Sequence, residues 1–157
     1  LDADFSNGTV TGGVFENLGH AGGGDGIDLS GAQVSITGTK FFNIADKAIS
    51  VGEESSLTSS KLSITKAGVG IVSKDGSHVT VQDSIIMETK LAGLMAYTKK
   101  PVYPSATLNA ENMLFKKLTL NALVQHKNKL TLNGITVKPT DFDVNKLYKT
   151  LMKSGIQ

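Results

Sequence analysis

The chain has 157 residues, enough for one domain with a sizeable core and too few for two. It contains no cysteine, which excludes a disulfide framework and a thiolate metal site, and all sixteen of its basic residues are lysines. Without arginine the chain lacks the usual bidentate anchor for phosphates, so we expect no nucleic-acid partner.

The net charge of +2 is distributed unevenly, at −4 up to Phe115 and +6 from Lys116 onward. Such a basic second part is typical of a solvated face that protects a sheet edge, or of a surface for an anionic partner. No apolar stretch approaches the ~18 residues that a membrane span needs, so no span is predicted. The chain begins at Leu1 without a methionine or a signal sequence, which suggests a domain excised from a larger protein.

The first predicted coil fits the later ones in part. Val10 and Phe15 stand five residues apart, and residues 15–18 (FENL) parallel residues 41–44 (FFNI). Asn17 therefore falls over Asn43, which predicts a short asparagine ladder at a corner. The glycine-rich residues 19–26 are interpreted as an insertion between coils, because they lack the Gly-Lys-Ser/Thr ending of a phosphate loop.

Later segments begin on a small residue followed by an apolar one, at 26–29 (GIDL), 48–51 (AISV), 70–73 (GIVS), 93–96 (GLMA) and 122–125 (ALVQ). The first three starts are 22 residues apart, and the fifth is delayed by a turn-rich insertion after Lys99. Stacking the repeats would align like residues in one ladder: Ile27, Ile49, Ile71, Leu94 and Leu123.

Two further apolar slots recur in each unit. The first is a pair of alternating positions: Val34/Ile36, Leu57/Ser59, Val79/Val81, Ala106/Leu108 and Leu130/Leu132. The second lies five residues after each pair: Phe41, Ile64, Ile86, Met113 and Val137. Each unit therefore contains three short strands of period two, separated by turns of Gly, Ser, Thr, Asn and Asp.

Three slots at one period predict an all-β fold, a single-stranded right-handed parallel β-helix with about six coils of ~22 residues over about 5–137. The whole chain, 1–157, is predicted to be a single domain. A β-sandwich also has many short strands but does not predict this register, and the leucine-asparagine consensus of leucine-rich repeats is missing.

The last segment changes its period. Val144, Leu147, Tyr148 and Leu151 share one face of a short helix predicted over about 142–154, with Asp141 or Asp143 as its N-terminal cap. We expect this helix to cap the exposed edge of the last coil and close the core, with an interaction helix as the alternative.

Four pieces of the repeat, GDGIDLSG (24–31), DKAISVGE (46–53), GIVSKDGS (70–77) and GLMAYTKK (93–100), resemble the β-helical domains of bacterial secreted or surface proteins. The resemblance is to the right-handed β-helix, pectate-lyase-like superfamily, including domains found beside spore-coat-H-type (CotH) kinase-like regions. It implies an extracellular, cell-surface or periplasmic location and other domains in a parent protein. It does not specify an activity, because the superfamily includes lyases, glycosidases, adhesins and inert spacers.

Stacking also aligns polar residues in columns. The third position after each ladder residue gives Ser30, Gly52, Lys74, Tyr97 and His126, and the next gives Gly31, Glu53, Asp75, Thr98 and Lys127. Glu53, Lys74 and Asp75 are therefore the candidate catalytic residues, since paired carboxylates beside a base carry acid–base chemistry in glycan-cleaving enzymes. The alternative is a set of solvated charges at a solenoid corner.

Candidate ligand-binding residues lie at the start of the same sheet and in the second insertion: Asp28, Asp46, Lys47, Tyr97, Lys99 and Lys100. Tyrosines beside a groove can stack on sugars, and lysines pair with acidic groups. Residues 23–28 (GGDGID) match the start of a calcium-binding nonapeptide, so Asp25 and Asp28 are candidate calcium ligands. The match fails at Ser30, where that motif has a large apolar residue, so a glycine-rich turn is the alternative. No other cofactor is expected.

These features predict a non-catalytic β-helical scaffold or carbohydrate-binding module with a polysaccharide partner. The first alternative is a polysaccharide lyase or glycosidase that acts on an acidic glycan through Glu53, Lys74 and Asp75. The second is an assembly module that associates through an exposed terminal coil. Without arginine or clustered aspartates, the sequence favours the scaffold over the enzyme.

Overall fold

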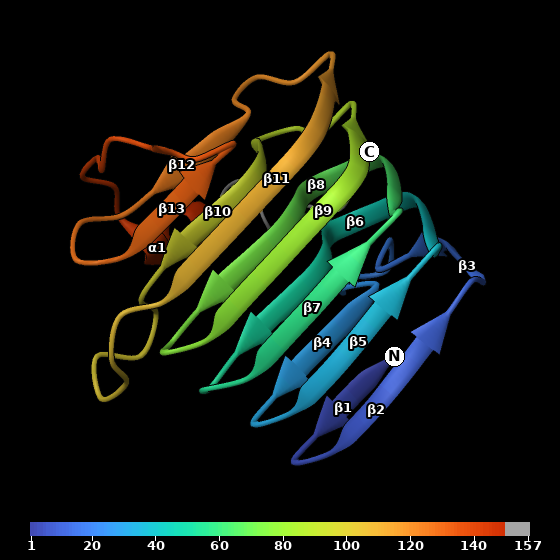
Figure 1. Ribbon diagram of the computed structural model, residues 1–157, viewed down its shortest axis with the longest axis horizontal. Helices are drawn as coiled ribbons and strands as arrows, with labels where there is room; N and C mark the ends of the chain where they lie inside the picture. Colours follow the sequence, from blue (N-terminus) through green and yellow to red (C-terminus); the bar gives the residue numbers. More distant parts are fainter. Residues whose placement is uncertain (150–157) are drawn as a thin grey trace.

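The computed structural model describes residues 1–149, which wind into a solenoid of stacked coils with three sheets (Figure 1). The first sheet contains β1 (Asp2–Asp4), β4 (Ile27–Ser30), the second halves of β6 (Lys40–Gly52) and β8 (Ser63–Lys74), β10 (Ala92–Tyr97) and β12 (Ala122–Val124). The second sheet contains β2 (Asn7–Thr11), β5 (Gln33–Thr37), β7 (Ser56–Ser60), the first halves of β9 (His78–Met87) and β11 (Thr107–Lys116), and β13 (Lys129–Leu132). The third sheet contains β3 (Val14–Leu18), the first halves of β6 and β8, and the second halves of β9 and β11.

Within residues 1–149 the strands pair in parallel, except that β14 (Ile135–Thr136) folds back antiparallel to β13. Both predicted insertions are present. Residues 19–26 (the glycine loop) join β3 to β4, and residues 98–106 (the β10–β11 loop) protrude from the stack (Figure 1). The predicted all-β solenoid of about six coils is confirmed.

Left-handed residues bend each coil at its corners. The corner between the second and third sheets has a positive φ on successive coils at Gly12, Gly38, Lys61, Asp83 and Asn112. Gly, Asn and Asp adopt this conformation at the lowest cost, which explains their frequency in the predicted turns. At another corner Asn43 Nδ2 donates to Asn17 Oδ1 at 2.7 Å, which confirms the asparagine ladder.

The core is a continuous column of inward side chains from all three sheets. Ile27, Ile49, Ile71 and Leu94 are register partners on successive coils, as predicted, and all four are fully buried. Burying each such side chain contributes roughly 1.5–3 kcal/mol.

The small residue before each ladder position is required by close backbone packing. A Cβ atom on Gly70 would lie 2.3 Å from the carbonyl oxygen of Gly93 on the next coil. A Cβ atom on Gly26 would lie 2.6 Å from the carbonyl oxygen of Ala48. Both distances are far shorter than van der Waals contact, so these positions tolerate no side chain without movement of a backbone.

The predicted register is correct beyond the glycine loop but wrong beyond the β10–β11 loop. Leu94 pairs with Ala122, so Leu123 is shifted by one residue and lies on the outer face. A one-residue shift exchanges the two faces of a strand, and burial decides between them. The same one-residue shift moves His126 out of the column in which it was predicted.

The other slips keep the inward face. Val79 pairs with Leu108, and Val81 with Ala110, instead of Ala106 and Leu108. In the third slot Ile86 pairs with Phe115 instead of Met113. A slip of two residues leaves the same face inward, so period two alone cannot detect it. Val137 lies after the antiparallel β14 and continues no parallel strand.

The C-terminal helix is present as α1 (Val144–Leu147), with Asp143 as its N-cap. Val144 and Tyr148 pack on Val72 and Met95, whose side chains lie on the outer face of the first sheet. The helix therefore covers a flank of the solenoid rather than the end of its core. Residues 150–154 of the predicted helix lie outside the described residues.

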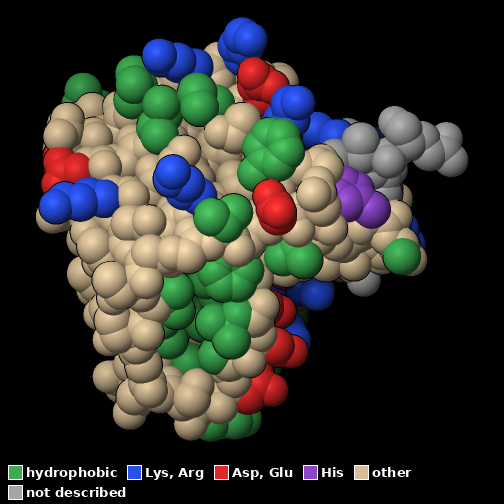
Figure 2. Space-filling model, turned by 90° about the vertical axis from the view of Figure 1, so that its right-hand side faces the viewer, with side chains coloured by type: hydrophobic (Ala, Val, Ile, Leu, Met, Phe, Trp, Pro, Cys, Tyr) green, Lys and Arg blue, Asp and Glu red, His purple; other side chains and the backbone are tan. Residues whose placement is uncertain are grey.

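The end of the solenoid at the first coil exposes apolar side chains. Figure 2 looks at this end and shows hydrophobic groups surrounded by backbone and uncharged polar groups, with acidic side chains along one side. Phe5 is 87% exposed and Val14 is 59% exposed, whereas Phe15 stacks on Phe41 with ring centroids 5.2 Å apart.

No helix within residues 1–149 is both long and apolar enough to cross a membrane.

Candidate functional site

The outer face of the first sheet changes from polar to apolar along the stack. One column of register partners runs Asp28, Ser50, Val72 and Met95. The apolar end of this column lies under the segment that contains α1. A cleft forms where the polar end meets that segment.

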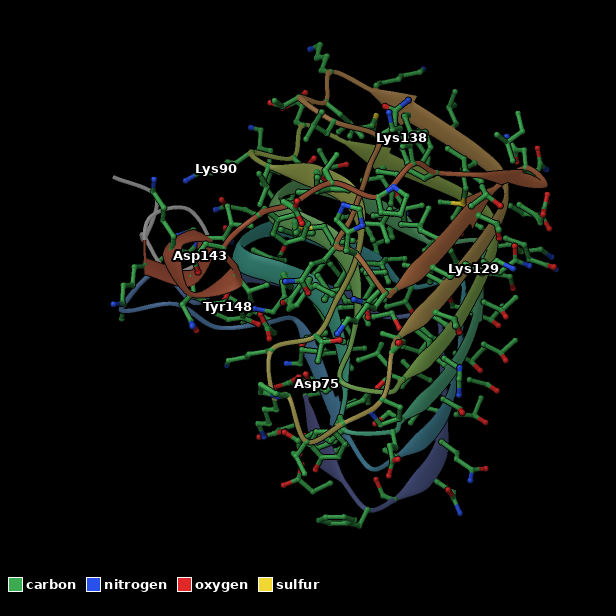
Figure 3. The ribbon with its side chains drawn as sticks, turned by 90° about the vertical axis from the view of Figure 1, so that its left-hand side faces the viewer. Asp75, Lys90, Lys129, Lys138, Asp143 and Tyr148 are labelled. Carbon is green, nitrogen blue, oxygen red and sulfur yellow. The ribbon has the colours of Figure 1, made fainter. Side chains whose placement is uncertain are left out.

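The cleft has a volume of about 430 Å³. Its floor is the outer face of the first sheet, and its walls come from the glycine loop, the β10–β11 loop and the residue that follows α1. Figure 3 shows Tyr148 beside α1 and Asp75 beside the β10–β11 loop. The charged lining residues are Asp2, Asp25, Asp28, Asp46, Lys47, Lys74 and Lys99.

Lys47 is the centre of a buried charge cluster on one wall of the cleft. Its side chain is 2% exposed, and its Nζ lies 3.0 Å from Asp25 Oδ1 and 2.7 Å from Asp46 Oδ2. The backbone amide of Lys47 also donates to Asp25 Oδ1 at 3.0 Å. The other oxygen of Asp46, Oδ1, is buried without a hydrogen-bond donor among the described residues. A buried acceptor without a donor costs about 1–3 kcal/mol, so Asp46 is held in an unfavourable state.

The pKa values of the cluster follow from this burial. Burial raises the pKa of the Asp46 carboxyl above its ordinary value of 3.8, Lys47 opposes that rise, and Asp25 adds to it. Burial alone would lower the pKa of Lys47, but attraction by Asp25, with Tyr148 and Asp46, raises it above 10.5. Lys47 therefore keeps its charge at neutral pH, and burial makes the ionised form of Asp46 less favourable than it is in water.

Lys74 lies across the floor of the cleft. Its Nζ donates to Ser50 Oγ at 2.9 Å and lies 3.8 Å from Asp28 Oδ1, which is ion-pair range but too long for a hydrogen bond. Gly52 makes this path possible, because a Cβ atom there would lie 2.5 Å from Lys74 Cε. Gly52 and Ser50 therefore place the Lys74 ammonium over the polar floor.

Tyr148 connects the cleft to the apolar face beneath α1. Its hydroxyl shares a 2.7 Å hydrogen bond with the hydroxyl of Tyr97. The ammonium groups of Lys47 and Lys99 lie 5.0 and 4.3 Å from the centre of its ring. Tyr97 is fully buried, so the predicted stacking of a sugar on this ring has no accessible surface. Burial also raises the pKa of Tyr97 well above 10.0, so its hydroxyl stays protonated.

Two of the three predicted catalytic residues hold the β10–β11 loop. Asp75 is fully buried, and its Oδ1 accepts from the backbone amides of Lys99 and Lys100 at 2.7 Å each. Glu53 accepts from Lys100 Nζ at the surface. Lys74, the last residue of β8, points into the cleft instead, because it lies two residues after Val72 on the outer face of the strand. The three residues therefore do not form one constellation.

Most of the predicted ligand-binding residues do meet in the cleft. Asp28, Asp46, Lys47 and Lys99 line it, whereas Lys100 pairs with Glu53 outside it. Among residues 1–149 no group of three His, Asp or Glu side chains is placed to hold a metal ion. Asp25 is paired with the Lys47 ammonium. The calcium site at Asp25 and Asp28 stays a prediction.

Sequence reasoning missed the roles of Ser50 and Tyr148. Ser50 belongs to a predicted strand, and its outward position followed from period two, but its contact with Lys74 depends on how the lysine crosses Gly52. Tyr148 was assigned to the apolar face of the helix, yet nothing in the sequence indicated which surface that face would cover.

Comparison with known proteins gives one family. A family model described as the right-handed beta helix region matches residues 3–150. No curated protein and no solved structure matches the chain.

Proposed function

Because the chain belongs to the right-handed β-helix family, we propose that it is a non-catalytic module that binds a polysaccharide in the cleft of the first sheet. One observation carries the proposal, namely a concave polar site of about 430 Å³ built on paired strands. Rigid strands hold polar side chains at fixed positions, which reduces the entropy lost when a ligand binds.

The chemistry of the lining fits the hydroxyl groups of a sugar. A hydroxyl can donate to a carboxylate and accept from an ammonium, and both kinds of group face the cleft at Asp28 and Lys74. Gly22, Gly23 and Gly24 form part of the wall and have no side chains to occupy the space. The cleft therefore offers hydrogen-bonding partners to a chain of linked sugars.

The positions of the predicted catalytic residues support a binding role over catalysis. Asp75 and Glu53 contact the β10–β11 loop, so neither carboxylate is directed to a ligand in the cleft. Glycoside cleavage requires two carboxylates on either side of the scissile bond, and the predicted pair does not supply them. We therefore favour binding without cleavage.

The cellular setting is also a proposal, based on the resemblance of the repeat segments to those of bacterial secreted proteins. In this proposal the chain acts outside the cell, at its surface or in the periplasm. It would be one domain of a larger protein, and that protein could be one with a CotH kinase-like region.

A matched pair of blocking variants tests the proposed function. Asp2 and Asp4 are both exposed on β1, but only Asp2 lines the cleft. Neutral, acidic and amine-bearing oligosaccharides are titrated by calorimetry, and the products are analysed by chromatography. We expect at least one glycan to bind intact, to lose its binding in Asp2→Trp and to keep it in Asp4→Trp. Absence of binding to every glycan, or equal binding by both variants, would contradict the proposal.

One observation favours glycoside hydrolysis as a second candidate. The Asp46 carboxyl lies in the cleft with a raised pKa, which is the property of a general acid. Under this alternative the chromatography shows shortened glycans, and Asp46→Asn abolishes their release while Asp75→Ala does not. Intact glycan after prolonged incubation excludes it.

A further inference from the structure

We infer that the cleft selects sugars that carry a protonated amine over sugars that carry a carboxylate. The inference rests on the proposed function and specifies its ligand class. It follows from which charged groups of the cleft already have partners and which do not.

The lysines of the cleft are already engaged. Lys47 is 2% exposed and is held by two aspartates. Lys74 is 9% exposed and donates to Ser50. The Lys99 ammonium lies over the Tyr148 ring. A carboxylate on a ligand would therefore compete with the aspartates that already serve as counter-ions of Lys47 and Lys74.

The aspartates, in contrast, retain capacity to accept hydrogen bonds. Asp46 is 4% exposed, lines the cleft and has one oxygen, Oδ1, without a donor among the described residues. Asp28 Oδ1 is likewise buried and has no hydrogen-bond donor among the described residues, although the Asp28 side chain as a whole is 39% exposed. Two carboxylates of the cleft therefore each have one acceptor without a donor.

The preference is local to these two carboxylates and does not come from a net charge. Four aspartates and three lysines line the cleft together with the α-ammonium of Leu1, which donates to the carbonyl oxygen of Gly26, so the formal charges balance. An ammonium group beside Asp28 or Asp46 gains a counter-ion, whereas a uronate there meets a like charge. Hydrogen bonds from an ammonium to a carboxylate are charge-assisted and about twice as strong as neutral ones. An amino sugar supplies that ammonium together with hydroxyl donors.

The test compares three tetrasaccharides by calorimetry in the presence of EDTA: a glucosamine oligomer, its N-acetylated counterpart and an oligogalacturonate. We expect the glucosamine oligomer to bind at least about tenfold more tightly than the other two, which is the effect of one charge-assisted hydrogen bond. Asp28→Asn should reduce that affinity by about tenfold. Glu16→Gln removes the same charge from an exposed residue of β3 and should leave the affinity unchanged.

The outcomes separate the inference from the proposed function. If the N-acetylated or uronate oligomer binds as tightly and Asp2→Trp blocks it, the inference is wrong and the proposed function stands. If the uronate binds tightly only after calcium is added, the carboxylates serve a metal ion and the inference is also wrong. If none of the three binds, both the inference and the proposed function fail.

Discussion

Replacing Lys47 by methionine should destabilise the fold strongly, although the two side chains have similar length and the site is buried. The Lys47 ammonium contacts Asp25 at 3.0 Å and Asp46 at 2.7 Å, and the Asp46 side chain is only 6% exposed. Lys47→Met therefore leaves a buried carboxylate without its counter-ion. Removing one partner of a buried ion pair costs about 3–5 kcal/mol, so we expect a loss of free energy of unfolding in that range at pH 7.

The pH dependence of this loss gives a second readout. Lys47 has a raised pKa in the fold, so its stabilising contribution is fully present below pH 10.5 and is lost as the pH rises through the folded value. Asp46 also has a raised pKa. Its contribution to the free energy of unfolding is therefore most favourable below pH 3.8 and is lost as the pH rises through the folded value. Lys47 opposes the rise in the Asp46 pKa, so Lys47→Met should raise that pKa further, at about 1.4 kcal/mol for each unit. The difference between the parent and Lys47→Met should therefore be large at pH 7 and small near pH 4.

Denaturant unfolding followed by circular dichroism measures both effects. Asp46→Asn combined with Lys47→Met removes the stranded charge and should recover at least half of the loss. Lys129→Met is the control, because Lys129 is exposed on the second sheet, and it should change the free energy of unfolding by no more than about 0.5 kcal/mol. If Lys47→Met costs less than about 1 kcal/mol, or the same at pH 4 and pH 7, the buried ion cluster does not contribute as the geometry indicates.

Three further predictions concern backbone packing, the tyrosine pair and the loop anchor. Gly70→Ala should lower the free energy of unfolding by about 1–3 kcal/mol, because its Cβ would lie 2.3 Å from a carbonyl oxygen. Gly8→Ala is the control and should be neutral, because nothing lies within 4 Å of its Cβ. Equal unfolding midpoints for the two variants would contradict this prediction. Tyr148→Phe leaves the buried Tyr97 hydroxyl without its partner and should cost about 1–3 kcal/mol, and adding Tyr97→Phe should restore part of that loss in the same unfolding assay. Asp75→Ala should remove the hydrogen-exchange protection of the first two lysine amides of the β10–β11 loop; unchanged protection would show that the carboxylate does not hold the loop.

The repeat shows how far the sequence alone carries a structural prediction. Ile27, Ile49 and Ile71 recur at equal spacing, and their stacking into one ladder followed from period and spacing without any tertiary information. The register then slipped by one residue at Leu123 and by two at Met113, both beyond the β10–β11 loop. A loop of irregular length carries no periodicity, so the pattern on one side does not specify the register on the other.

The charged residues divide in the same way. Asp28, Asp46 and Lys47 were expected on one edge, and the coil spacing suffices to bring their backbones together. The sequence could not indicate that Asp75 would turn toward the β10–β11 loop while Lys74 crosses Gly52 to reach Ser50. Long side chains reach across neighbouring coils, so their partners depend on packing in three dimensions.

The sequence by itself therefore determined the solenoid and its inward side chains, because both depend on short-range periodicity. The tertiary structure alone decided where the C-terminal segment packs, since an apolar helix face fits any apolar surface of the right shape. That choice buried Tyr97 beneath Tyr148 and placed one wall on the cleft. It also decided which carboxylates have partners, because burial and counter-ions are properties of the assembled coils.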